Sequence, residues 1–87
     1  GVRVAGRFLQ TVLNALNRQG NDYPDLDPDG RIGPATISAL AAFLRVRGQA
    51  GRTVLLRALN GLQAARYLQI AEADQSQERF LYGWLLH

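Results

Sequence analysis

Apolar side chains near the start of the chain recur at intervals of three and four residues, which is the spacing of an amphipathic helix. The recurring residues are Phe8, Leu9, Val12, Leu13 and Leu16. Polar residues at Gln10, Asn14 and Asn17 fall between them, and Gly20 follows. The pattern predicts a helix over about residues 6–18.

The next stretch, residues 20–33, has no sustained helical period and is rich in polar side chains. Pro24 and Pro28 keep the residues before them out of the helical region of backbone conformation. Ile32 is predicted to pack in the core. The stretch as a whole predicts a long, ordered loop between the first two helices.

Helical spacing then returns in three further stretches. The pattern predicts a second helix over residues 34–46 and a third over about 53–73, separated by a short break at 48–51. Asp74, followed by Gln77, forms a capping box of the kind that opens a helix, and this predicts a last helix after it.

Two glycines fall inside these predicted helices, at Gly61 and Gly83. A helical glycine costs about 1 kcal/mol relative to alanine. Both are therefore predicted to mark close approaches between helix backbones. Trp84, at helical spacing beside Phe80 and Leu81, is predicted to be a packing residue more than a ligand platform.

These elements predict an all-α fold: a compact single-domain bundle of about four helices, with a long ordered loop between helices 1 and 2. The 87 residues suffice for one small domain, and 47% of them are apolar. We expect the domain to cover residues 5–87, with residues 1–4 as a tail that is disordered or left by cutting or cloning. The chain contains no cysteine, which excludes disulfides and cysteine metal sites. We interpret it as a piece of a longer protein.

The charges are unevenly distributed along the chain. The formal net charge is +3, and all ten basic residues are arginines, which suit bidentate binding of carboxylate or phosphate groups. Four aspartates in the loop precede four arginines in the following segment: Asp22, Asp25, Asp27 and Asp29, then Arg45, Arg47, Arg52 and Arg57. Such asymmetry is more typical of a solvated surface than of a ligand site.

Asp25, Asp27 and Asp29 alternate ahead of Gly30, as in the first half of an EF-hand calcium loop. Calcium loops of that type use a bidentate Glu at the twelfth position, where this chain has Thr36. We therefore expect no metal or other cofactor. A calcium-stabilised loop with these three aspartates as ligands is kept as a minor alternative.

Two other classes of function have little support in the sequence. A helix-turn-helix has a turn of about three or four residues, whereas this loop is longer, and its acidic side chains would repel phosphates. Catalysis needs a positioned pair of groups, but the single histidine, His87, is terminal. We expect no nucleic-acid binding, no catalysis by this chain and no membrane insertion, and we predict a monomer.

The most specific motif is a turn over residues 29–36 with the sequence Asp-Gly-Arg-Ile-Gly-Pro-Ala-Thr, followed by a helix that carries Ala39 and Phe43. This arrangement resembles the peptidoglycan-binding modules of cell-wall hydrolases. The long third helix and the closing motif at residues 80–84 are most similar to the C-terminal peptidoglycan-binding domain of phage-type lysozymes, or secretion activator proteins.

The resemblance implies a module whose partners are peptidoglycan and a lysozyme-like (muramidase) catalytic domain N-terminal to it. It also implies a place in the bacterial cell envelope, in the periplasm or cell wall. Enzyme activity would then belong to the N-terminal domain, which is a glycoside hydrolase in this family. The alternative is a structural domain that packs on the catalytic domain without binding glycan itself.

The residues predicted to bind the ligand all lie in or beside the loop. They are Tyr23, Asp29, Gly30, Arg31, Gly33 and Thr36. Tyr23 and Arg31 are predicted to make the first contacts, because aromatic rings pack on sugar faces and guanidinium groups bind the carboxylates of stem peptides. The other four are more typical of residues that shape a loop.

Overall fold

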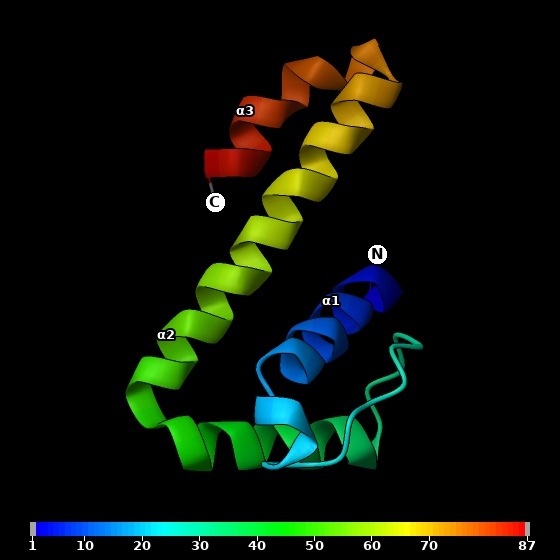
Figure 1. The fold of residues 1–87 in the computed structure, drawn as a ribbon. Helices are drawn as coiled ribbons and strands as arrows, with labels where there is room; N and C mark the ends of the chain where they lie inside the picture. The colour runs from blue at the N-terminus through cyan, green and yellow to red at the C-terminus, as the bar shows by residue number, and fades with distance from the viewer. Residues whose placement is uncertain (1, 87) are drawn as a thin grey trace.

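The computed structural model describes residues 2–86, which form three α-helices and two short 3-10 turns, with no strand in that range (Figure 1). In chain order these are α1 (Val2–Ala15), η1 (Arg18–Gly20), α2 (Pro34–Ala73), η2 (Gln75–Gln77) and α3 (Glu78–Leu86). The all-α prediction and the predicted loop between the first two helices are confirmed. None of the described helices is long and apolar enough to cross a membrane.

Helix α2 combines the second and third predicted helices, with a single sharp bend at Gly48 (Figure 1). Gly48 has φ 62° and ψ −149°, a conformation that residues with a Cβ rarely adopt. Helical structure resumes directly after it, so the predicted break at 48–51 narrows to one residue. The bend divides α2 into two arms, which we call the first arm (34–47) and the second arm (49–73).

The core lies where α1 sits in the angle between these arms (Figure 1). Its members are Val12, Leu13, Tyr23, Ala39, Ala42, Phe43 and Leu55. Leu13 and Phe43 are almost completely buried. Residues from α1, the loop and both arms therefore share one apolar cluster, and this cluster fixes the angle of the bend.

The far end of the molecule is more open than the predicted bundle. Helix α3 folds back along the second arm, yet none of its residues is buried (Figure 1). The radius of gyration is 14.6 Å, against about 12 Å expected for a compact domain of this length. The prediction of a compact bundle therefore holds around the α1 core and is wrong for the α2–α3 end.

Several local predictions need correction. Residues 2–4, expected to be a tail, form the first turn of α1, where Arg3 Nε donates to the carbonyl of Asp29 at 3.3 Å; Gly1 lies outside the described residues. Ile32 is 46% exposed instead of buried, because the turn points it outward. Gly61 and Gly83 have no heavy atom within 4 Å of a built Cβ, so neither marks a close helix contact.

The close backbone approach occurs instead between Gly6 on α1 and Gly30 in the loop. A Cβ at Gly6 would overlap the carbonyl oxygen of Gly30, and a Cβ at Gly30 would lie 2.6 Å from the carbonyl oxygen of Arg3. Gly30 also has φ +82°. Both glycines are therefore needed to let the loop lie against the helix backbone.

We predict that Gly6→Ala destabilises the protein by about 1–3 kcal/mol, because the new methyl group meets backbone that cannot move aside. Gly61→Ala is the matched control, since it is also helical but faces open space. It should stabilise the protein by up to about 1 kcal/mol through helix propensity alone. Urea unfolding of both variants measures the difference, and equal effects would contradict the proposed packing.

Candidate functional site

Three amide side chains hold the loop against α1 and its C-terminal extension. Gln10 and Asn14 are four residues apart and lie on one face of α1, and Asn17 follows two residues after the helix ends. Gln10 and Asn17 are each only 1% exposed. Each amide side chain offers donors and an acceptor. It can therefore pair with backbone N–H and C=O groups of the loop that have no partner in a helix or strand.

Gln10 joins the turn at residues 29–31 to the start of α2. Its Nε2 lies within hydrogen-bond distance of the Arg31 carbonyl at 2.9 Å, the Thr36 hydroxyl at 3.0 Å and Asp29 Oδ1 at 3.2 Å. Its Oε1 accepts a bond of 2.8 Å from the amide of Gly30. One buried side chain thus contacts polar groups of four residues in the loop and in α2.

Asn14 and Asn17 hold the first half of the loop in the same way. Asn14 binds both backbone groups of Leu26, accepting from its amide at 2.7 Å and donating to its carbonyl at 2.8 Å. Asn17 donates to the carbonyl of Tyr23 and to Asp25 Oδ1, and accepts from the Tyr23 amide. The loop is ordered because its backbone groups are paired with α1.

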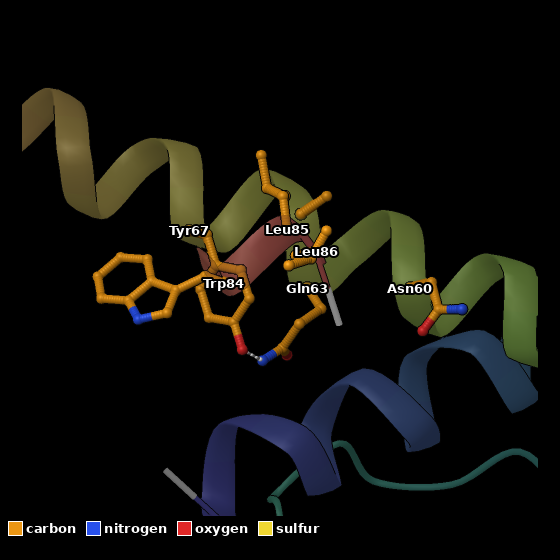
Figure 2. Close-up of a pocket in the computed structure, with 7 residues that line it drawn as sticks. Asn60, Gln63, Tyr67, Trp84, Leu85 and Leu86 are labelled. Atoms are coloured by element: carbon orange, nitrogen blue, oxygen red, sulfur yellow. Dashed lines mark hydrogen bonds between the residues drawn. The ribbon is translucent and has the colours of Figure 1, made fainter. Parts of the chain in front are cut away.

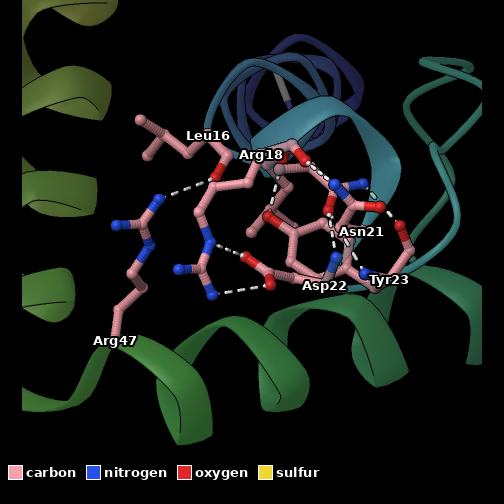
Figure 3. Close-up of polar contacts among 8 residues, drawn as sticks. Leu16, Arg18, Asn21, Asp22, Tyr23 and Arg47 are labelled. Atoms are coloured by element: carbon pink, nitrogen blue, oxygen red, sulfur yellow. Dashed lines mark hydrogen bonds and ion pairs between the residues drawn. The ribbon is translucent and has the colours of Figure 1, made fainter.

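Figure 3 shows the polar contacts at the junction between α1 and the loop. Arg18 makes a bidentate pair with Asp22, with bonds of 2.8 and 2.9 Å, and this pair lowers the pKa of the Asp22 carboxyl. The pair is exposed on the Arg18 side, so it adds little stability. Arg47 reaches from α2 to the carbonyl of Leu16 at 3.4 Å.

The structure separates the predicted ligand-binding residues into two groups. Tyr23, Gly30 and Thr36 are buried, and the Tyr23 hydroxyl donates to the Leu13 carbonyl at 2.6 Å. Burial raises the pKa of the Tyr23 hydroxyl. Tyr23 is therefore a member of the core cluster that also lines a cleft beside the loop, and its predicted contact with ligand stays a prediction.

Asp29, Arg31 and Gly33 remain at the surface, with Gly33 half-buried. The Arg31 amide donates to Asp29 Oδ1 at 2.8 Å, forming a short turn closed by the side chain. This bond, followed by the Gln10 amide and then by the nearby charges of Arg31 and Arg3, holds the pKa of Asp29 below its ordinary value of 3.8. The main role of Asp29 is thus to hold the turn that places Arg31 at the surface.

A surface depression runs between the loop and the first arm of α2, and we call it the loop groove. It consists of two adjoining clefts of about 210 and 340 Å³, which share Leu26 and Ala35. Its charged lining residues are Asp22, Asp25, Asp27, Asp29, Arg31 and Arg45. A groove with both charges suits a ligand that carries both carboxylates and amines.

The aspartates do not converge as an EF-hand would require. No group of three or more acidic or histidine residues within 2–86 is placed to hold a metal ion. Asp25 Oδ1 is bonded to Asn17, and Asp29 Oδ1 to Gln10 and to the Arg31 amide. The Asp-x-Asp-x-Asp-Gly pattern here forms hydrogen-bonded turns.

The sequence-based site omitted Gln10, Asn14 and Asn17, which the apolar periodicity had assigned to a polar helix face. Their spacing was the available signal, because three amides at i, i+4 and i+7 beside a long loop can replace its missing backbone partners.

The family model described as "Predicted Peptidoglycan domain" matches residues 4–87. The chain belongs to this family. No curated protein matches it. Peptidoglycan is accordingly the ligand that family membership indicates, and such binding implies association with the cell wall.

We predict that Gln10→Ala lowers the free energy of unfolding by about 2 kcal/mol, because buried groups of the loop lose their partner at a cost of about 1–3 kcal/mol each. Thr11→Ala is the control, because Thr11 is the next residue of α1 and is exposed. Its free energy of unfolding should stay within about 0.5 kcal/mol of the parent value. Amide hydrogen exchange at Gly30 should accelerate in the Gln10 variant only. Unchanged exchange there would contradict the role assigned to Gln10.

The lowered pKa of Asp29 predicts a specific acid dependence. The Asp29 carboxyl takes up a proton at higher pH in the unfolded state than in the folded state. The ionised carboxylate therefore stabilises the fold fully above the ordinary pKa of 3.8, and this stabilisation is lost as the pH falls through the folded pKa. The difference in melting temperature between the parent and Asp29→Asn should therefore shrink on acidification. Asp22 and Asp74, whose pKa values are also lowered, occur in both proteins and cancel. A constant difference would contradict this account.

Proposed function

We propose that this domain binds peptidoglycan through the loop groove and thereby brings a lysozyme-like (muramidase) domain to the bacterial cell wall. The observation that carries the proposal is the charge pattern of the groove, in a chain that belongs to a peptidoglycan family. Catalysis is assigned to the partner domain, and the setting is the periplasm or cell wall of a bacterium, or a phage enzyme acting there.

The stem peptide is the part of peptidoglycan that suits this groove. Stem peptides carry carboxylates, which the guanidinium groups of Arg31 and Arg45 would bind through paired hydrogen bonds. They also carry amines where a diamino acid is present, and the aspartates beside the arginines would bind those. Gln10 and Asp29 already hold the turn that carries Arg31. Ligand binding would therefore not have to pay the entropy cost of ordering the loop.

A shallow groove predicts weak binding by the isolated domain, because little surface is buried to offset the cost of association. Tethering changes this. A catalytic domain joined to the module would stay near the wall at high effective concentration, even when each single contact is short-lived.

A second candidate function is packing against the catalytic domain without glycan binding. It is favoured by the apolar side chains that α2 and α3 leave at the surface. Those on the second arm and α3 are Val54, Leu56, Leu68, Phe80, Tyr82, Leu85 and Leu86. A domain surface with this much exposed apolar area is typical of an interaction face.

Co-sedimentation with purified insoluble peptidoglycan distinguishes the two functions. We predict that the parent sediments with the wall and that Arg31→Ala reduces the bound fraction at least several-fold. Arg52→Ala is the matched control, because it removes the same charge from an exposed position outside the groove. Equal loss in both variants would indicate nonspecific charge attraction.

Tyr23→Phe completes this series. It should lower stability by about 1 kcal/mol through loss of the bond to Leu13, while wall binding at a temperature where it is folded stays unchanged. If the parent fails to sediment at any loading, autonomous wall binding is excluded and packing on the catalytic domain becomes the function.

A further inference from the structure

A second cleft lies between the second arm of α2 and α3 (Figure 2). We call it the aromatic cleft. Its lining residues are Asn60, Gln63, Ala64, Tyr67, Trp84, Leu85 and Leu86. Its volume is about 350 Å³, within the range of roughly 300–1,000 Å³ of small-molecule sites. In contrast to the loop groove, no charged side chain lines it among the described residues.

The aromatic rings of the cleft are held in place by their neighbours. The Trp84 ring lies 5.1 Å from that of Tyr67, at an angle of 38°, and 6.0 Å from that of Phe80, at 24°. The guanidinium of Arg79 covers the Phe80 ring at 4.7 Å. Trp84 is nevertheless only half-buried. A rigid indole with part of its surface open can bind a ligand without losing side-chain freedom.

Two amide side chains line the same cleft, with Gln63 next to Tyr67 and Asn60 farther along α2 (Figure 2). Gln63 Nε2 donates to the Tyr67 hydroxyl, which leaves the carbonyl oxygen of Gln63 available to accept (Figure 2). The exposed Asn60 amide, one turn earlier on α2, makes no hydrogen bond to the other residues drawn in Figure 2. The cleft thus combines an apolar aromatic surface with uncharged donors and acceptors.

We propose that the aromatic cleft binds the glycan strand, taking an N-acetylhexosamine unit. The apolar C–H face of a pyranose would pack on Trp84, while Asn60 and Gln63 would bond its hydroxyl and acetamido groups. A neutral site of this kind suits a sugar and does not suit the charged stem peptide. The choice of a wall glycan rests on the proposed function, and the stem peptide would occupy the loop groove.

The test uses a soluble probe, the β-1,4-linked tetramer of N-acetylglucosamine, which has no stem peptide. Trp84 is the only tryptophan in the chain, so its fluorescence reports on this cleft alone. We expect a saturable change in emission at millimolar sugar, with matching heat in a calorimetric titration. Asn60→Ala should weaken binding about 3- to 10-fold, the loss expected for one hydrogen bond.

Gln69→Ala is the matched control, because it is an exposed amide on the same helix arm outside the cleft, and it should leave affinity unchanged. Arg31→Ala should also leave tetramer binding unchanged while it reduces sedimentation with whole peptidoglycan. These two results together would show that the loop groove and the aromatic cleft bind their ligands independently.

The proposal is overturned if neither emission nor heat changes with the tetramer. If the parent still sediments with peptidoglycan in that case, the proposed function stands and only the glycan site is lost. The proposal is also overturned if Asn60→Ala and Gln69→Ala have the same affinity for the tetramer. Emission that depends on protein concentration, with a dimer in sedimentation equilibrium and no response to sugar, would assign the cleft to self-association.

Discussion

The buried amide of Gln10 is the contact on which the rest of this structure depends. A loop of this length leaves many backbone groups without helix or strand partners, and burying them unpaired would cost about 1–3 kcal/mol each. Gln10 binds groups of the turn and of the first turn of α2 at the same time. Among the described residues no buried side-chain nitrogen or oxygen lacks a hydrogen-bond partner.

The same contact determines the path of the chain. Because Gly6 and Gly30 have no side chains, the loop backbone lies directly on α1 and brings Pro34 to the start of α2. The first arm then crosses α1, and the bend at Gly48 returns the second arm over the other side of the core. Loop order and the position of Arg31 thus follow from one polar network and two glycines, while the apolar cluster and Gly48 set the angle between the arms.

The sequence predicted the features that depend on local pattern. Apolar period and turn residues located the helices, the loop and the interruption at Gly48. Contacts between distant segments were harder. A two-class pattern of apolar and polar residues placed Gln10 on the outer face, because it cannot distinguish a solvated amide from one paired with a loop. It likewise could not show that Gly6, and not Gly61, meets another backbone.

The loop groove and the aromatic cleft differ in the chemistry of their lining residues. The loop groove carries charges of both signs, whereas the aromatic cleft carries rings and amides. The first arm of α2 lines the loop groove, and the second arm lines the aromatic cleft from Asn60 to Tyr67. On the proposed function, a polymer that repeats peptide and sugar along its length would engage both clefts at once. Wall material would then be favoured over short fragments, since two weak contacts on one folded domain bind together more strongly than either alone.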